Sequence, residues 1–399
     1  MTQLLPFFIV LFAGLFFSDV FSRLHIPWVV ALILGGILIG PSAFGIFEAD
    51  ATIDFIGQIG LIFLMFMAGL ETNFSTFKKN AKNIVGLSLF NGLLPFIVGV
   101  GIGFAFGYSL IVSLLIGIIF ISSSIAVVMP SLEVSGLLRT RIGNYIVSAT
   151  VIEDIISLVF FSVLFQTISP ITSLSLPVFY ILLAVFLVFF RWLVPKLQWL
   201  LTRLSGDRNK LFQPELQVMF VILIGIVITF ELLGLHPIIA GFFAGAVLSS
   251  SIHTDILKDK LKTLSYGLFI PIFFIVIGSK TDLSVFTQLE GAGLIALVII
   301  LGSMLAKFIS GWFGGRISGF STNESAFIGA STIPQLSTTL AAAFAGFEFG
   351  LLDQRLLTAL VLLSIVTTIV GPMLMRTFRK KAKEKSSDAP EVVDIKYGV

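Results

Sequence analysis

The sequence has no cysteine and little charge. Its 399 residues include no cysteine, three histidines and only 12% charged residues. The lack of cysteine excludes disulfides, thiolate metal sites and thiol redox chemistry. Soluble globular domains average about 25% charged residues, whereas 57% of this chain is hydrophobic. The composition is therefore that of a membrane protein.

Motifs of catalysis and nucleotide binding are also missing. The chain has no HExxH or GxSxG motif and no βαβ segment that carries GxGxxG. Its histidines, His25, His236 and His253, lie near the ends of predicted loops. We therefore expect no enzyme, no cofactor and no nucleic-acid partner. The first apolar run begins at Leu4 without a basic segment or a cleavage site, which predicts a retained helix and not a signal peptide.

Thirteen apolar runs have the character of membrane-spanning helices. A helix needs about 20 apolar residues to cross a bilayer, and the ninth and tenth runs are short for a full span. We predict an all-α membrane protein with a transmembrane domain over 1–376 and a basic cytoplasmic tail over 377–399. The predicted spans are 3–22, 27–46, 53–71, 83–107, 109–132, 141–167, 176–200, 215–234, 236–251, 264–279, 289–312, 323–346 and 355–376.

The basic residues of the loops alternate along the chain and predict an orientation. Cytoplasmic loops of membrane proteins are enriched in Lys and Arg. If the N-terminus is outside, the opposite loops hold only Lys280 and Arg355. We predict a multi-pass protein of the cytoplasmic membrane, with the N-terminus outside and the C-terminus inside. The basic residues on the predicted cytoplasmic side are Arg23, Lys78, Lys79, Lys82, Arg139, Arg141, Arg203, Arg208, Lys210, Lys258, Lys260, Lys262, Arg316 and those from Arg376 onward.

Two pairs of segments repeat at a nearly constant offset. GLETNFSTF at 69–77 matches GSKTDLSVF at 278–286, and LHIPWVVALILGG at 24–36 matches LHPIIAGFFAGA at 235–246. An odd number of predicted spans separates the copies, so the second copy crosses the membrane in the opposite sense. Inverted repeats occur in many secondary transporters, which bind substrate where the halves meet. We predict repeat units over about 3–167 and 215–376; chance similarity of glycine- and phenylalanine-rich helices is the alternative.

Two predicted spans contain both a hydroxyl cluster and a proline. ISSSIAVVMPSL at 121–132 and GASTIPQLSTTL at 329–340 correspond in the repeat. Proline kinks or breaks a helix, and freed backbone groups persist in a membrane only beside protein or a watery cavity. We predict two broken helices that cross at a substrate site; ordinary proline kinks are the alternative. The predicted lining residues are Ser122, Ser123, Ser124, Thr332, Pro334 and Gln335.

Three charged residues lie well inside predicted spans. Glu153 and Asp154 are adjacent in ATVIEDIISL (149–158), and Lys307 lies in the run over 289–312. A charge at the bilayer centre costs about 2.5–3.5 kcal/mol on insertion scales, so each is expected to have a partner. Neighbours on a helix point about 100° apart, so one acid can pair with Lys307 while the other addresses the crossing. For Lys307 the alternatives are a purely structural ion pair and snorkelling to the membrane surface.

The acid pair predicts exchange of a proton for a cation. Two carboxylates in a partly dry site repel each other when both are ionised. One of them can bind a proton or, when ionised, a small cation such as Na⁺ or K⁺, with hydroxyl and carbonyl oxygens of the broken helices completing the shell. Competition of both ions for one carboxylate couples their movements. We predict a secondary active transporter that exchanges Na⁺ or K⁺ for H⁺, with Glu153 and Asp154 as the binding residues.

As an ordered set, seven motifs resemble the membrane domain of the monovalent cation:proton antiporter-2 family. That family includes sodium/proton antiporters and Kef-type potassium efflux systems, and the resemblance covers about residues 1–375. The motifs are GGILIGPSAFG (35–45), MFMAGLETN (65–73), SSSIAVVMPSL (122–132), ATVIEDIISL (149–158), LHPIIAGFFAGAVL (235–248), PIFFIVIGSKTDL (271–283) and LAKFISGWFGGR (305–316).

The resemblance implies a thirteen-helix homodimer in membrane lipid, with a dimerisation domain and a core domain that moves like an elevator. It also implies that Asp154 binds cation and proton in turn, and that Lys307 is the partner of Glu153. Family members often have Asp-Asp, Asn-Asp or Gln-Asp where this chain has Glu153-Asp154. In the family, an acidic first residue tends to accompany net charge movement. Kef-type members carry a nucleotide-binding domain for which this sequence shows no segment, so we expect no nucleotide gating within this polypeptide.

Two other transport functions are the alternatives. A potassium efflux channel without obligatory proton coupling would be expected to show a carbonyl-lined filter such as TVGYG, which the sequence lacks. A transporter of organic anions would need cationic side chains at the broken helices, where only Lys307 is available. The choice among Na⁺, K⁺ and Li⁺ stays open, because oxygen ligands serve all three ions.

Overall fold

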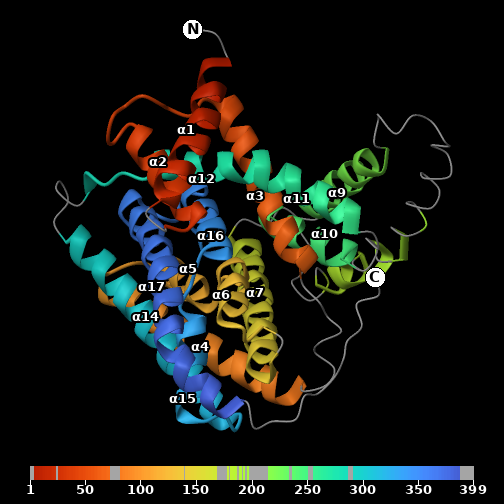
Figure 1. Cartoon of the computed structure of the whole chain (residues 1–399). Helices are drawn as coiled ribbons and strands as arrows, with labels where there is room; N and C mark the ends of the chain where they lie inside the picture. Colours follow the sequence, from red (N-terminus) through yellow and green to blue (C-terminus); the bar gives the residue numbers. More distant parts are fainter. Residues whose placement is uncertain are drawn as a thin grey trace.

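The described part of the chain is helical throughout and contains no strand in this computed structural model (Figure 1). It covers residues 4–23, 26–71, 81–138, 140–168, 214–232, 236–249, 255–285 and 291–386, together with parts of a helix between 178 and 196. The helices are α1 (Leu4–Ser22), α2 (Trp28–Ile39), α3 (Ala51–Glu71), α4 (Ala81–Ala105), α5 (Leu110–Ile121), α6 (Ile125–Ser135), α7 (Arg141–Ile168), α9 (Pro214–Leu232), α10 (Pro237–Leu248), α11 (Asp255–Leu264), η3 (Ser265–Phe269), α12 (Ile270–Ser279), α14 (Ala292–Ile317), α15 (Thr322–Thr332), α16 (Ser337–Glu348) and α17 (Gln354–Ser386).

Eight helical stretches in the described residues are long and apolar enough to cross a membrane, and four shorter apolar helices accompany them. The chain is therefore a multi-pass membrane protein. The predicted run over 27–46 is helical only as far as Ile39, because Gly40 and Pro41 end α2. The run over 264–279 is the second half of a continuous helix from Asp255, with η3 as its π-helical centre. The predicted helix over 176–200 and the basic loop residues 78–79, 139 and 203–210 lie wholly or partly outside the described residues.

The last helix is longer than the sequence predicted. We expected it to end at residue 376 and the polar tail to follow, but α17 continues to Ser386. The added turns are rich in Lys, Arg and Glu, which favour helix, so their polarity marks the end of the apolar run and not the end of the helix. The rest of the predicted tail, 387–399, lies outside the described residues.

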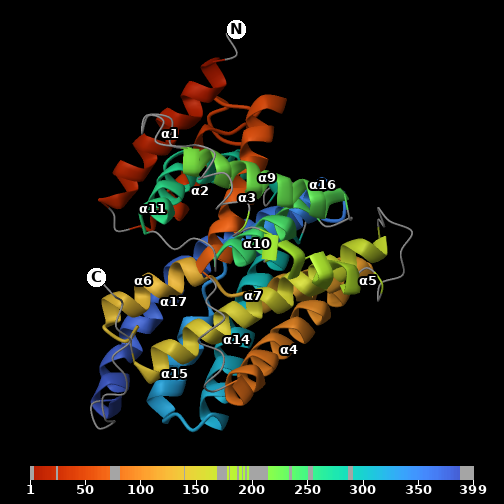
Figure 2. The same cartoon turned by 90° about the vertical axis from the view of Figure 1, so that its right-hand side faces the viewer.

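The helices form two groups, which Figure 2 separates except for α16, which lies at their boundary. We call α1–α3 and α9–α12 the flanking group, in which α3 packs on α10 and α2 on α12. We call α4–α7 and α14–α17 the crossing group, in which α14 packs on α4, α15 and α17, and α7 on α4 and α5. Each group combines helices from both halves of the chain.

Glycine pairs bring two helix crossings of the flanking group into backbone contact. A Cβ built on Gly36 would lie 3.0 Å from Cα of Gly278, and one on Gly69 would lie 3.0 Å from Cα of Gly245. Both pairs lie in or next to the segments that match in the sequence repeat. Each of the α2–α12 and α3–α10 crossings therefore joins a segment of one predicted repeat copy to a segment of the other.

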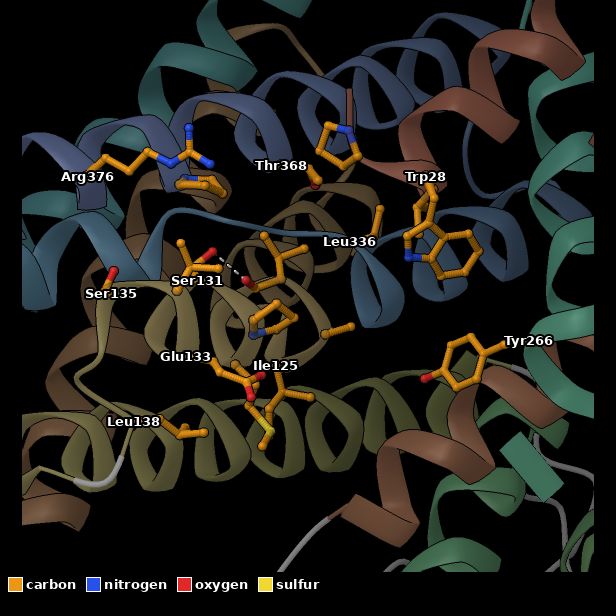
Figure 3. Close-up of a pocket in the computed structure, with 18 of the residues that line it drawn as sticks. Trp28, Ile125, Ser131, Glu133, Ser135, Leu138, Tyr266, Leu336, Thr368 and Arg376 are labelled. Carbon is orange, nitrogen blue, oxygen red and sulfur yellow. Dashed lines mark hydrogen bonds between the residues drawn. The ribbon is translucent and has the colours of Figure 1, made fainter. Parts of the chain in front are cut away.

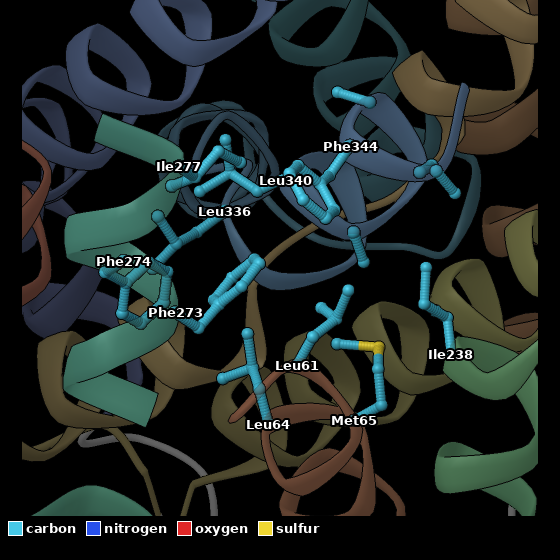
Figure 4. Close-up of a cluster of buried hydrophobic side chains, with 14 of the residues drawn as sticks. Leu61, Leu64, Met65, Ile238, Phe273, Phe274, Ile277, Leu336, Leu340 and Phe344 are labelled. Atoms are coloured by element: carbon cyan, nitrogen blue, oxygen red, sulfur yellow. The ribbon is translucent and has the colours of Figure 1, made fainter. Parts of the chain in front are cut away.

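The two groups meet along an apolar seam (Figure 4). Leu336, Leu340 and Phe344 line the crossing-group side, in α16 and the residue before it, and all are buried. The facing side chains come from α3, α10 and α12 and are also buried; they include Leu61, Leu64, Met65, Ile238, Phe273, Phe274 and Ile277.

Candidate functional site

Two helices of the crossing group are interrupted and meet at their interruptions. α5 ends at Ile121, and Ser122–Ser124 are extended before α6 begins. α15 ends at Thr332, and residues 333–336 precede α16. The predicted break of the span over 109–132 is present at the hydroxyl cluster, whereas Pro130 lies inside α6 and does not break it. Proline lacks the N–H that would bond one turn back, so α6 loses that bond and still continues to Ser135.

The two linkers satisfy each other's polar groups. The backbone N–H of Ser124 donates to the carbonyl of Pro334 at 2.7 Å. Ser123 Oγ lies 3.0 Å from the carbonyl oxygen of Thr332, and the hydroxyls of Ser122 and Thr339 share a bond of 2.9 Å. This reciprocal bonding lets non-helical backbone persist inside a membrane protein.

Lys307 and Glu153 form a fully buried ion pair beside the crossing. The Nζ of Lys307 lies 3.0 Å from Oε2 of Glu153, and both side chains are 0% exposed. Nζ also donates to Ser123 Oγ at 3.0 Å and to the carbonyl of Ile121. Ile121 is the last residue of α5, where the helix dipole is negative. The ammonium therefore faces both a carboxylate and the negative end of a half-helix.

Glu153 is hydrogen-bonded at both of its oxygens. Ser123 Oγ donates to Oε2 at 2.7 Å in addition to Lys307, and Asn91 Nδ2 donates to Oε1 at 2.6 Å. Asn91 comes from α4 and is itself fully buried. Asn91 was not among the site residues predicted from the sequence, although an isolated amide within an apolar span was a visible signal.

Asp154 lies in different surroundings from its neighbour. It is 3% exposed, and Thr338 Oγ1 donates to its Oδ1 at 3.1 Å. The backbone of Ser123 also contributes a hydrogen bond to this carboxylate. Thr338 lies in the first turn of α16, where the helix dipole is positive. Asp154 thus faces the positive end of one half-helix while Lys307 faces the negative end of another.

The other predicted lining residues also gather at the crossing, with different tasks. Gln335 donates from Nε2 to the carbonyl of Phe120 at 3.1 Å and accepts from Ser303 at 3.0 Å. Thr332 donates from Oγ1 to the backbone carbonyl of Lys307 at 2.9 Å. Both therefore fasten the linkers to neighbouring helices. Ser124 differs, because its buried hydroxyl has no hydrogen-bond partner among the described residues.

A cavity of about 1180 Å³ opens between the two groups and reaches the crossing (Figure 3). Trp28 and Tyr266 line it from the flanking group, α6 and α17 line it from the crossing group, and Leu336 belongs to the linker before α16. Its charged lining residues are Glu133, Lys262, Arg376 and Arg379.

The opposite end of α17 is tied to the flanking group by hydrogen bonds. Gln354 Nε2 donates to the carbonyl of Lys280 at 2.7 Å, and Thr358 Oγ1 donates to that of Asp282 at 3.3 Å. Gln58 of α3 also donates to Glu348, which ends α16, at 3.2 Å. The boundary between the groups is therefore open at one end and bridged at the other.

Known proteins resemble the chain over nearly its whole length. Residues 7–380 match the family described as sodium/hydrogen exchanger, transmembrane. The chain is similar to the probable Na⁺/H⁺ antiporter 3 of Methanocaldococcus jannaschii, at 33% identity over 96% of this chain and 98% of the relative. It is also similar to the Na⁺/H⁺-K⁺ antiporter GerN of Bacillus cereus, at 27% identity over 92% of this chain and 94% of the relative.

A solved structure shares the fold. The structure of the sodium proton antiporter MjNhaP1 from Methanocaldococcus jannaschii at pH 8 matches with a TM-score of 0.71 at 19% identity. The match covers 96% of this chain and 99% of that one. The arrangement of helices described above is therefore that of a known antiporter.

Proposed function

The chain belongs to the sodium/hydrogen exchanger family, and we propose from this premise that it exchanges Na⁺ or K⁺ for H⁺ across the cytoplasmic membrane by alternating access. Its relatives are antiporters, so it is a transporter and not an enzyme. The name of the Bacillus cereus relative includes K⁺ beside Na⁺, which supports keeping both ions. The finer antiporter-2 assignment and the homodimer stay predictions.

The observation that carries the proposal is the sparse bonding of Asp154. Thr338 provides its one side-chain hydrogen bond within the described part of the chain, whereas Glu153 accepts three. Asp154 therefore has unused acceptor capacity in a buried position. We assign to it the cation and the proton in turn, with the hydroxyls of Thr338 and Ser124 as further oxygen ligands.

The charge of the site explains why ion binding at Asp154 and movement of the crossing group would be coupled. The Lys307–Glu153 pair has no net charge, so ionised Asp154 leaves the crossing with one negative charge. One proton or one monovalent cation at Asp154 neutralises it. A charged, unloaded crossing would be costly to move past the apolar seam, because the seam cannot solvate an ion. The crossing group would move more readily with a proton or a cation bound than with neither. Movement in one direction with one ion and back with the other is exchange.

The open and bridged ends of the group boundary support alternating access. Thr358 at the bridged end and Arg376 at the cavity are about 27 Å apart along α17. The apolar seam between them consists of apolar contacts, including an edge-to-face contact of Phe273 with Phe344, and such contacts can slide without breaking a hydrogen bond. We assign the flanking group to the predicted dimerisation domain and the crossing group to the moving core domain.

We assign the cavity to the cytoplasmic side. Lys262, Arg376 and Arg379 line it, and cytoplasmic ends are enriched in basic residues. With this assignment the C-terminal end of α17 lies inside, and the same basic residues contribute to the orientation predicted from the loops. The conformation is then open to the cytoplasm.

Asp154→Asn tests the exchange. In proteoliposomes with a clamped membrane potential, wild-type protein should dissipate a pH gradient when Na⁺ or K⁺ is added. In Asp154→Asn this response should fall to the background level. Asp19→Asn is the matched control, because the Asp19 side chain is exposed on α1 and, among the described residues, its ion pair is with neighbouring Arg23. Wild-type exchange in Asp154→Asn would refute the assignment. Cation flux without proton movement in the wild type would favour the channel alternative.

Cysteine labelling tests alternating access, because the chain has no native cysteine. A single Ser131→Cys probe lies in the cavity. Adding Gln354→Ala and Thr358→Val removes two bridges at the other end and should favour the state in which the cavity is closed. With two neutral hydrogen bonds of about 1 kcal/mol each, we expect the labelling rate of the Ser131→Cys probe to fall at least about threefold. An unchanged or faster rate would contradict the proposed movement; Thr377→Val, at the far end of α17, is the control.

A further inference from the structure

Asn91 is a fully buried amide in the otherwise apolar central part of α4. Its Nδ2 donates to Oε1 of Glu153 at 2.6 Å, and its Oδ1 accepts from the hydroxyl of Ser310. A buried amide is costly unless its groups are hydrogen-bonded. Here both ends of the amide have a partner, and one of them is the carboxylate next to Asp154.

The hydrogen bonds that link Ser310, Asn91 and Glu153 in one row have a defined donor-to-acceptor direction. An ionised carboxylate only accepts hydrogen bonds, so the amide must donate to Glu153 and turn its oxygen toward Ser310. Ser310 lies one turn after Lys307 on α14 and also contacts the backbone carbonyl of Lys307 at 3.0 Å. One helix therefore supplies both the cation that pairs with Glu153 and the anchor for the amide.

Among the described residues, Asn91 supplies the only donor to Oε1 of Glu153, while Ser123 and Lys307 both bond Oε2. Without Asn91, Oε1 would be a buried acceptor with no donor, and the carboxylate would gain freedom to rotate. The ammonium of Lys307 would follow it. Any shift of that ammonium toward Asp154 would repel a cation bound there.

The length of the Glu153 side chain fits this arrangement. An aspartate at the same position would withdraw the carboxylate by about one carbon–carbon bond, ~1.5 Å. A hydrogen bond of 2.6 Å to Asn91 would then be stretched beyond ordinary hydrogen-bond length. The glutamate therefore reaches an amide on α4 that a shorter acid would not.

We propose that Asn91, anchored by Ser310, is a positioning residue for the exchange: it holds the Glu153 carboxylate and Lys307 away from Asp154, so that Asp154 alone meets the cation. This inference rests on the function proposed above. Asn91 acts through Glu153 and does not itself touch the ion.

The first test compares Asn91→Ala with Ser88→Ala. Ser88 lies one turn earlier on α4, is equally buried, and donates to the backbone carbonyl of Ala149. We expect Asn91→Ala to raise the apparent KM for Na⁺ about tenfold, the size of a lost hydrogen bond to a charged group. Ser88→Ala should change KM less than about twofold. Equal shifts in both variants would indicate a merely structural role and overturn the proposal.

The second test exchanges the lengths of the two side chains. Glu153→Asp and Asn91→Gln should each raise KM, whereas the double variant moves one methylene from one partner to the other and should recover most of the loss. Ser310→Ala should act in the same direction as Asn91→Ala but more weakly, and should add little to it, because the two act in one row. Additive effects, or no recovery in the exchanged pair, would contradict the inference.

A measurement of Na⁺ binding that does not need transport distinguishes failure of the proposed exchange from failure of the positioning role of Asn91. The shift in melting temperature caused by Na⁺ can be measured for each variant in detergent, so an inactive variant still reports on binding. If wild-type protein exchanges no cation for H⁺, the proposed function fails. If wild-type exchange is intact and the Na⁺-dependent melting of Asn91→Ala matches wild type, only the positioning role of Asn91 fails.

Discussion

The two sides of α7 at the helix crossing differ in how completely their carboxylates are bonded. On one side, Glu153 has Lys307, Ser123 and Asn91 around both oxygens. On the other side, Asp154 has the hydroxyl of Thr338 and a backbone contact from Ser123. We call these the paired side and the open side. The two acids are adjacent in the chain, so the difference arises from the helices packed against each face.

The difference assigns separate roles to the two carboxylates, one in holding the crossing together and one in binding the ion. A carboxylate whose acceptor positions are filled by protein donors has little left for a cation, and moving it would expose several buried groups at once. A carboxylate with unfilled positions can accept an ion without dismantling its surroundings. The paired side therefore serves as the frame, and the open side is where we place the exchange.

Removing Lys307 should break the paired side with the largest effect. Lys307→Met leaves Glu153 buried without its cation, and breaking such a pair costs about 3–5 kcal/mol. We expect a large fall in melting temperature in detergent. Glu153→Gln added to Lys307→Met removes the orphaned charge and should restore most of the stability. Equal melting temperatures for the single and double variants would show that the ion pair does not stabilise the crossing.

Substitutions of Ser123 and Ser124 also test the comparison of the paired side with the open side, with a smaller expected loss of stability than for Lys307. Ser123→Ala removes a donor to Glu153 and should lower stability by about 1–3 kcal/mol. The hydroxyl of Ser124 has no partner among the described residues, so Ser124→Ala should leave the melting temperature nearly unchanged. If Ser124 is a cation ligand, its loss should raise the apparent KM for Na⁺ about fivefold.

The outcome for this serine pair separates two quantities, stability and cation affinity. Matching losses of stability in both variants would show that the linker is held as one unit. An unchanged KM in Ser124→Ala would remove Ser124 from the proposed ligands and leave Thr338 and Asp154.

Several features of the fold were predictable because they depend on local chemistry. Apolar length marks membrane helices, and most spans lie within a few residues of the predicted runs. The hydroxyl cluster Ser122–Ser124, predicted to line the broken-helix site, lies at the interruption between α5 and α6. Proline alone was a poorer guide, because Pro130 is accommodated inside α6 while Pro334 lies in a linker.

Other features required packing that the sequence does not display. Asn91, Ser303, Ser310 and Thr338 lie far along the chain from the residues they bond. Single polar residues in apolar helices are common, and their importance depends on the face they occupy. That face is decided by helix rotation and by the neighbours that pack against it.

From the sequence alone, the membrane location, the broken helices and the need for partners of Glu153, Asp154 and Lys307 could be determined, because the bilayer penalises unpaired charge and unbonded backbone wherever they occur. Only the tertiary structure decided which acid has which surroundings. Adjacent side chains on a helix point about 100° apart. The packing of α4 against one face of α7, where Lys307 also reaches in from α14, placed Glu153 among donors, and α16 on the other face left Asp154 open.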